Sequence, residues 1–296
     1  MHIPRLAEIA KFVTIPLSLI DFSVHPHPGR TSTATHRSVS IESEAMSGLD
    51  QLRSHRTGLA LSGGSVRGIA HIGVAKALTD YGIRPSVITG TSAGSLVGAA
   101  LAAGMTWRQI EQMAQSIFWP RLLHGRTLER FCSKYLPATF AELEIPFIAM
   151  ATELPARTVV AISEGNLASA ISASCAMPGV RRAVNRAGKH LKDGGISCVL
   201  PSAPCRSLGA EFIIAADVWE VSSLLHEMGI GPDHRWATRA YPPHYQAALR
   251  HTDLLIRPRI PWSSYLSGPQ AIQRMISAGE QATKRVLDQA LGQLIQ

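Results

Sequence analysis

Short runs rich in apolar and β-branched residues alternate along the chain with longer amphipathic segments. The short runs predict strands at residues 59–61, 85–89, 147–151, 158–162 and 212–218. The amphipathic segments predict helices that begin near Ile69 and end before Gly82, and at residues 95–103, 107–118, 127–135, 167–174 and 272–294. This alternation predicts an α/β fold, a three-layer α/β/α sandwich with a mainly parallel central sheet.

The two ends of the chain differ from this core in their pattern. Residues 1–55 predict an N-terminal extension or linker, and a flexible leader is preferred because the apolar stretch there is short and interrupted by proline. Residues 56–296 predict one folded domain, with its core at 57–220 and a C-terminal loop or lid and helix at 221–296. Residues 221–250 favour a loop or lid, since they contain three prolines and three histidines with little periodicity.

The most informative local pattern is the pentapeptide Gly90-Thr91-Ser92-Ala93-Gly94, which falls where a predicted strand meets a predicted helix. A strand–GxSxG–helix junction places the serine on a tight, strained turn with its hydroxyl at the helix N-terminus. The flanking glycines avoid crowding the turn or an approaching substrate. The pattern predicts Ser92 as a nucleophile.

A glycine-rich segment lies about thirty residues earlier, between the predicted strand at 59–61 and the helix that follows it. Such a turn presents backbone N–H groups at the positive end of a helix, where an anion is stabilised. The spacing fits neither a phosphate-binding Walker loop nor a dinucleotide fingerprint. Beside a serine elbow, the segment favours an oxyanion hole built from the N–H groups of Gly63, Gly64, Ser65, Val66, Arg67 and Gly68.

The third element is Asp193-Gly194-Gly195. Residues 183–192 predict a hairpin with its turn at Arg186-Ala187-Gly188, which brings Asp193 to the end of a strand. Two glycines after a carboxylate allow another group to approach it closely. Asp193 can therefore accept the serine proton as a general base, whereas an Asp-Gly-Gly sequence alone would indicate only a turn.

Together these segments resemble the patatin-like phospholipase family, the bacterial patatin-like serine hydrolases. Residues 62–68 are similar to the family's oxyanion loop, residues 90–94 to its nucleophile elbow and residues 193–195 to its dyad carboxylate. A fourth segment that is similar to the family is Ala-Ser-Cys-Ala-Met-Pro-Gly-Val at residues 173–180. The resemblance covers residues 57–220.

The resemblance implies a serine acyl hydrolase that cleaves phospholipid or lysophospholipid carboxylic esters through an acyl-enzyme. It implies a Ser92–Asp193 dyad, a lipid ester substrate, and neither a metal nor an organic cofactor. The chain departs from the family pattern in three places. Ser65 stands where the family has glycine, Arg181-Arg182 replaces an apolar or proline-rich stretch, and Cys198-Val199 replaces Asn-Pro.

Two other functions remain open from the residues. A Ser–His–Asp esterase or thioesterase would need a histidine after the serine, and the chain offers His226, His234, His244 and His251. His71, in the helix after the glycine-rich segment, is interpreted as a packed residue. A lipid-sensing regulatory protein with weak catalysis is the second alternative, motivated by the three departures from the family pattern.

Composition narrows the choice of partners. The formal net charge is +8, but the basic residues form no block and no aromatic-interleaved basic motif, so nucleic-acid binding is not expected. A mildly positive protein would favour peripheral contact with anionic lipid surfaces. The four cysteines lack C-x-x-C spacing, which indicates reduced thiols and a cytoplasmic protein, and no histidine spacing indicates a metal.

Overall fold

The computed structural model describes residues 53, 55–116, 119–122, 126–219, 221, 241–260 and 268–293. The predicted extension at residues 1–55 therefore lies outside the described residues, apart from Arg53 and His55. The described part contains one eight-stranded sheet whose strands follow the path β5-β6-β3-β2-β1-β7-β8, with β4 paired to β3. The strands are β1 (Thr57–Leu61), β2 (Val87–Thr91), β3 (Phe147–Glu153), β4 (Thr158–Ile162), β5 (Val184–Arg186), β6 (Lys189–Asp193), β7 (Phe212–Ala216) and β8 (Leu254–Ile256).

Five strands of the sheet run parallel, which confirms the predicted α/β fold. These are β3, β2, β1, β7 and β8, and the remaining three strands join the sheet in antiparallel pairs. The helices are α2 (Ala70–Asp80), α3 (Ala93–Ala102), α4 (Trp107–Gln115), α5 (Trp119–Leu122), α6 (Thr127–Tyr135), α7 (Leu167–Ser174), α8 (Ser202–Ser207), α11 (Pro243–Arg250) and α12 (Pro269–Gln293).

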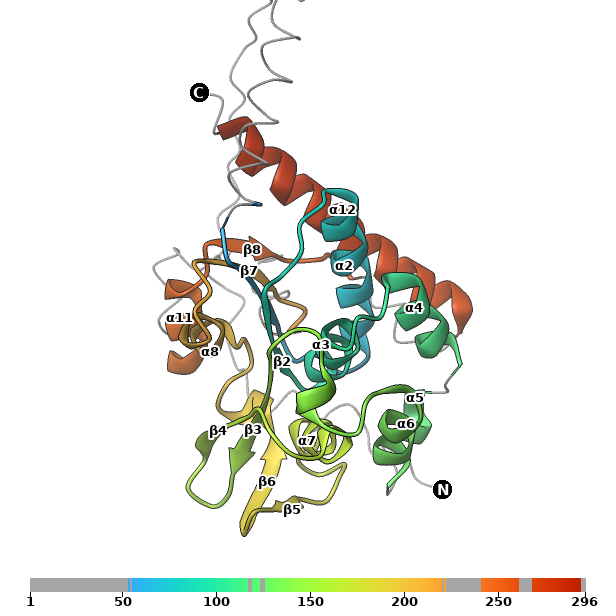
Figure 1. Cartoon of the computed structure of the whole chain (residues 1–296), viewed down its shortest axis with the longest axis vertical. Coiled ribbons are helices and arrows are strands. Elements are labelled where there is room, and N and C mark those ends of the chain that lie inside the picture. Colours follow the sequence, from blue (N-terminus) through green and yellow to red (C-terminus); the bar gives the residue numbers. More distant parts are fainter. Residues whose placement is uncertain are drawn as a thin grey trace, which may run out of the picture. The chain divides into compact units, whose positions relative to one another are not determined.

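Alternate residues of the central strands enter two separate hydrophobic cores, one on each face of the sheet. Leu59 and Leu61 of β1 pack with residues of α2, α3, α7 and α12, whereas Ala60 packs with Cys205 of α8 and Tyr245 of α11. Figure 1 shows α8 and α11 on one side of the strands and α2, α3 and α12 on the other. The period-two alternation of a strand thus produces the three predicted layers.

Most predicted elements are found where the pattern placed them, and the C-terminal part contains the exceptions. The bounds of β4, α6 and α7 agree with the prediction. The prediction that residues 221–250 form a loop or lid is wrong at α11, a helix that starts with proline in its first turn. Residues 222–240 lie outside the described residues. The helix α8 and the strand β8 were not predicted, because both are short and lack periodicity.

The two edges of β3 explain how the sheet brings distant residues together. Ala149 and Met150 pair with both β2 and β4, so these two strands lie on opposite edges of β3. Ala151 pairs with both β4 and β6, so β6 shares the edge that β2 occupies. The end of β2 therefore points at the end of β6 along one edge of β3.

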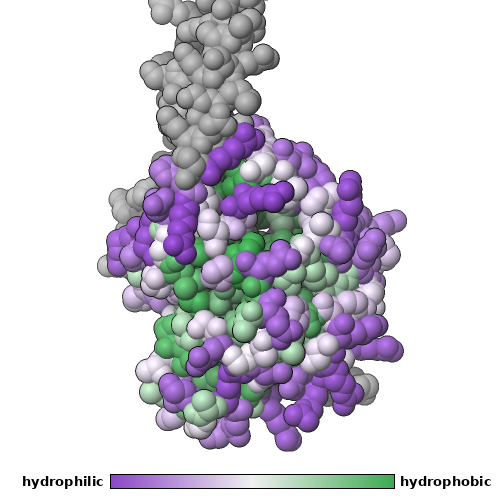
Figure 2. All heavy atoms as spheres, viewed as in Figure 1, coloured by the Kyte–Doolittle hydropathy of each residue, from purple (hydrophilic) through white to green (hydrophobic). Residues whose placement is uncertain are grey.

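The surface and thiols agree with an ordinary globular domain. Figure 2 shows hydrophilic side chains around most of the visible outline, with hydrophobic residues gathered between them. All four cysteines are free thiols. No helix in the described ranges combines the length and the apolar character needed to cross a bilayer.

The long helix α12 crosses α2 at two glycines. A Cβ atom on Gly73 would overlap with the carbonyl of Ile276, and one on Gly279 would overlap with the carbonyl of Ala70. These overlaps involve backbone atoms, which cannot move aside as a flexible side chain can. The close approach lets α12 cover α2, the helix that follows the glycine-rich segment.

We expect Gly279→Ala to lower the free energy of unfolding by about 1–3 kcal/mol, although alanine is the better helix former. Urea unfolding of the purified protein measures this change. Ser277→Ala, at an exposed position of the same helix, is the control and should change stability by less than about 0.5 kcal/mol. A Gly279→Ala protein that is more stable than wild type would contradict the close contact.

Candidate active site

Ser92 lies on a strained turn between β2 and α3. Its backbone dihedrals are φ 52° and ψ −122°, a conformation that non-glycine residues rarely adopt. Its N–H donates to Ser174 Oγ at 2.9 Å, which helps to hold this conformation. Cβ atoms at Gly90 and Gly94 would overlap with the carbonyls of Gly94 and Leu61, so backbone contacts rather than the substrate account for both glycines.

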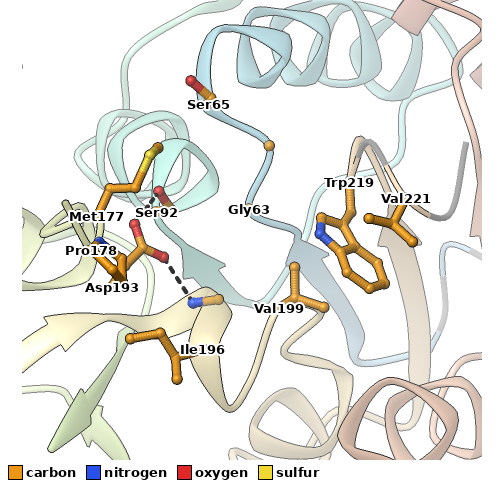
Figure 3. A pocket seen from close by; sticks show the side chains of 12 residues that line it. Gly63, Ser65, Ser92, Met177, Pro178, Asp193, Ile196, Val199, Trp219 and Val221 are labelled. Carbon is orange, nitrogen blue, oxygen red and sulfur yellow. Dashed lines mark hydrogen bonds between the residues drawn. The ribbon is translucent and has the colours of Figure 1, made fainter. Parts of the chain in front are cut away.

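Asp193 ends β6 and faces Ser92 (Figure 3). The hydroxyl of Ser92 donates to Asp193 Oδ2 at 2.8 Å. The other carboxylate oxygen, Oδ1, accepts a hydrogen bond from the N–H of Gly195 at 2.8 Å. A Cβ atom on Gly194 would overlap with the carbonyl of Met150, so the glycine allows the chain to turn directly against β3.

Burial changes the acidity of the Asp193 carboxyl group. Asp193 is only 6% exposed to solvent. Loss of hydration disfavours the charged form and raises the pKa of Asp193 to about 6, against the lowering effect of the hydrogen bonds from Gly195 and Ser92. A carboxylate with this pKa is a stronger base than a free aspartate and is still mostly ionised at pH 7.

The glycine-rich segment offers fewer N–H groups to the site than the sequence predicts. The N–H of Gly63 donates to Val199 O at 3.0 Å, and that of Arg67 donates to Gly64 O at 3.0 Å. Among the described residues, the N–H groups of Gly64 and Ser65 have no acceptor, and both residues line the pocket that contains Ser92.

The remaining two predicted donors lie in the short helix η2 (Ser65–Ile69), away from the pocket lining. Val66 packs against the hydrophobic core. Gly68 faces α3, where a Cβ atom would overlap with the Cβ of Ala93.

Ser65 occupies the left-handed region of the backbone, with φ 53°. The sequence resemblance places a glycine at this position, and glycine adopts the left-handed conformation more readily than other residues. Ser65 adopts it at a conformational cost of order 1 kcal/mol. A glycine would adopt the same conformation without this cost.

The glycine-rich segment is hydrogen-bonded to Val218, two residues beyond the end of β7. Arg67, only 4% exposed, donates from Nε to Val218 O at 3.1 Å. The N–H of Val218 in turn donates to Ser62 Oγ at 2.8 Å. These contacts make the Arg67 side chain a support for the glycine-rich segment.

The histidines do not approach the dyad within the part of the chain that the structure describes. His71 is buried behind the glycine-rich segment, where its Nε2 lies 3.0 Å from Ser62 O, and burial lowers its pKa to about 4. His244 and His251 belong to α11 and its C-terminal end, and neither lines the pocket. His226 and His234 lie outside the described residues.

A pocket of about 310 Å³ opens over Ser92 and Asp193. Figure 3 shows Met177 and Pro178 on one side of Ser92 and an apolar group on the other. That apolar group consists of Val199, Trp219 and Val221, with Ile196 below it. No group of three or more His, Cys, Asp and Glu residues within the described ranges is arranged to hold a metal ion.

The departures from the family pattern take different positions around this pocket. Arg181 turns away from it and donates to Leu122 O at 2.7 Å and to Ser172 Oγ at 2.9 Å. The carbonyl of Cys198 accepts a hydrogen bond from Thr91 Oγ1 at 2.8 Å, while Val199 forms part of the apolar wall. Of the departures, Ser65 and Val199 therefore line the pocket, whereas Arg181 does not.

Several lining residues were missed from the sequence, chiefly Ile196, Trp219 and Val221. One signal was available for Trp219. It follows the apolar run at 212–218, and ligands of open α/β sheets bind beyond the carboxyl ends of the strands. The position of Ser174 behind Ser92 has no comparable signal, because it depends on the packing of α7 against α3.

Comparison with known proteins agrees with the geometry. The family model "Patatin-like phospholipase" matches residues 59–203, which include the glycine-rich segment, the elbow and Asp193. Residues 59–203 therefore match a patatin-like phospholipase domain. The family resemblance of the sequence is thereby confirmed.

The chain spans only part of the length of the proteins that it resembles. An uncharacterized NTE family protein of Mycobacterium tuberculosis is 35% identical over 56% of this chain and 49% of its own length. Patatin-like phospholipase domain-containing protein 6 of Homo sapiens is 29% identical over 56% of this chain and 14% of its own length. The VipD structure from Legionella pneumophila has a TM-score of 0.47 and 14% identity, covering 79% of this chain and 67% of that one.

The burial of the Asp193 carboxylate predicts how the free energy of unfolding varies with pH. This dependence can be measured without an activity assay. Because the pKa of Asp193 is raised from 3.8 to about 6, its ionisation destabilises the folded state above about pH 6, and this cost vanishes below about pH 4. We expect Asp193→Asn to be more stable than wild type at pH 8, by up to about 3 kcal/mol, and to lose this advantage at pH 4.

Urea unfolding at pH 4, 6 and 8 measures the difference. Glu164→Gln, which removes an exposed carboxylate, is the control and should show no such pH dependence. An Asp193→Asn protein that is less stable than wild type at pH 8 would contradict the unfavourable burial of the charge.

Proposed function

We propose that this protein is a serine acyl hydrolase that cleaves carboxylic esters of lipids through a Ser92–Asp193 dyad. The observation that carries the proposal is the 2.8 Å hydrogen bond from Ser92 Oγ to Asp193 Oδ2 at the floor of an open, largely apolar pocket. A nucleophile in contact with a base is the common arrangement of covalent hydrolysis. The proposed catalytic unit comprises residues 56–296.

The first half of the reaction forms an acyl-enzyme. Asp193 accepts the proton of Ser92 as Oγ attacks the ester carbonyl, and the resulting oxyanion is stabilised by backbone N–H groups. Gly64 and Ser65 supply those groups, because their N–H groups are the ones in the pocket that have no acceptor among the described residues. The leaving alcohol takes the proton from Asp193 as its bond to the carbonyl carbon breaks.

The second half returns the enzyme to its starting state. Asp193 accepts a proton from water, the hydroxide attacks the acyl carbon, and Ser92 leaves with the proton as the carboxylic acid is released. The raised pKa of Asp193 supports both halves, since a base with a pKa nearer to 7 shares a proton more readily with the groups it serves.

The pocket lining and the family support a lipid ester as substrate. Val199, Trp219 and Val221 present an apolar surface suited to a hydrocarbon chain. The family model is that of patatin-like phospholipases, which favours a phospholipid or lysophospholipid within that class.

We expect Ser92→Ala and Asp193→Asn each to lower the turnover of lysophospholipid and p-nitrophenyl esters by roughly 10⁴-fold or more, because each removes one partner of the dyad. Ser277→Ala and Glu164→Gln, both exposed, are the matched controls and should keep wild-type rates.

Three outcomes would contradict the dyad. Turnover by either variant near the wild-type rate would exclude it. Full activity of Asp193→Asn, combined with loss on one histidine substitution, would indicate a Ser–His–Asp esterase. Lipid binding without turnover by the wild type would indicate a regulatory protein.

The pKa of Asp193 also predicts the acid limb of the pH–rate profile. Since the base must be ionised, we expect kcat/KM to fall about tenfold per pH unit below about pH 6 and to level off above it. Initial rates with a p-nitrophenyl ester, read at a pH-independent wavelength from pH 4.5 to 8.5, measure this limb. A profile that stays flat down to pH 5 would contradict Asp193 as the base.

A further inference from the structure

Two of the three residues of the apolar wall lie outside the region that matches the family model. Trp219 follows β7 and lines the pocket together with Val199 and Val221 (Figure 3). The family match ends at residue 203, so neither Trp219 nor the residues that hold it are assigned by the family.

A buried charged cluster lies directly behind this wall. Asp217 is fully buried and accepts hydrogen bonds from the hydroxyl of Tyr245 and, at 3.2 Å, from Arg257 Nε. Arg257 also donates to the hydroxyl of Tyr245 at 2.6 Å. Three polar groups from β7, α11 and the end of β8 thus close a network, and such networks fix the position of whatever they carry.

This network holds Trp219 in two ways. The N–H of Trp219 donates to Asp217 Oδ1 at 3.0 Å, which fixes its backbone. Its ring packs against Tyr245 with 5.3 Å between centroids, and Tyr245 stacks on Tyr241 at 4.9 Å. An indole held at both backbone and ring cannot swing aside to admit a longer ligand without disturbing a buried ion pair.

The same segment connects the wall to the glycine-rich segment. Val218, between Asp217 and Trp219, bonds through its backbone to Arg67 and to Ser62. The depth of the pocket and the place of the Gly64 and Ser65 N–H groups are therefore set by one short stretch of chain.

The character of the two sides decides which part of an ester meets Trp219. On the Trp219 side the lining residues Val199 and Val221 are apolar, which suits an acyl chain and not a charged head group. On the opposite side Met177 and Pro178 are apolar as well, but Pro178 is exposed, so that side leads to solvent and can take the polar leaving group.

We infer that Trp219 closes the acyl end of the pocket and makes the enzyme prefer, among lipid esters, those with short and medium acyl chains. Asp217, Tyr245 and Arg257 act as positioning residues for this wall. The inference rests on the proposed ester hydrolase function and adds to it the acyl selectivity and the residues that determine it.

The test compares kcat/KM for p-nitrophenyl esters from butyrate to dodecanoate, a series in which only the acyl chain varies. In Trp219→Ala we expect the dodecanoate-to-butyrate ratio to rise about tenfold, the scale on which a hydrophobic pocket discriminates added methylenes. Met177→Ala, on the opposite side of Ser92, is the matched control and should leave this ratio at the wild-type value.

Tyr245→Phe tests the positioning role, since it keeps the ring stack but removes the hydroxyl that joins Asp217 to Arg257. Because the network that holds Trp219 is weakened, we expect the same ratio to rise by up to about fivefold, with the melting temperature recorded separately. A purely structural role would lower all esters alike and leave the ratio unchanged.

A second measurement separates failure of the inference from failure of the proposed function. Binding of butyric to dodecanoic acid to Ser92→Ala, with and without Trp219→Ala, needs no turnover. We expect the added substitution to strengthen dodecanoate binding about tenfold relative to butyrate.

If wild type hydrolyses no ester, the proposed function fails while the binding series still decides the role of Trp219. An unchanged chain-length ratio in Trp219→Ala would overturn the inference even in an active enzyme. A change confined to leaving-group preference would overturn it as well.

Discussion

The site depends on one constraint of the sheet, namely that β2 and β6 share an edge of β3 and meet end to end. Thr91, the last residue of β2, pairs with Met150, and Asp193, the last residue of β6, pairs with the next residue, Ala151. Ser92 follows Thr91, so register alone brings the serine and the aspartate to the same point of β3. The hydrogen bond between their side chains follows from this meeting.

Several features that destabilise the folded state lie close to the point where β2 and β6 meet, and the rest of the fold must offset them. Ser92 and Ser65 both have positive φ angles, and Asp193 carries a buried charge. Each costs of order 1–3 kcal/mol. Two extensive hydrophobic cores, one on each face of the sheet, make these features tolerable. The hydrogen bonds from the Ser92 N–H to Ser174 Oγ and from the Val218 N–H to Ser62 Oγ keep the turn and the glycine-rich segment in place. The rigid scaffold thus keeps Asp193 buried, and this burial raises the pKa of its carboxyl group.

Local patterns predicted the layers and most elements, because these depend on short-range spacing. Ser92 and Asp193 are 101 residues apart, and they were paired because their motifs resemble those of a known family. The hairpin turn at Ala187 and Gly188 was expected from its residues, and both have positive φ angles. The hydrogen bond from the Gly63 N–H to the Val199 carbonyl was not predicted, because the sequence does not show which segment lies beside Gly63 in the fold. For the same reason the hydrogen-bond network around Asp217 was not predicted. Its members are 28 and 40 residues apart in sequence and meet only after α11 and β8 have packed.

The most direct test of the central claim is to trap the nucleophile. Wild-type protein is treated with a fluorophosphonate, and the modified residue is identified by mass spectrometry of its peptides. A serine polarised by a buried carboxylate should react, and the account predicts a single phosphonate on Ser92 that forms much more slowly in Asp193→Asn. A folded wild-type protein that remains unmodified, or one modified at another residue, would contradict the claim that the meeting of β2 and β6 creates an activated serine.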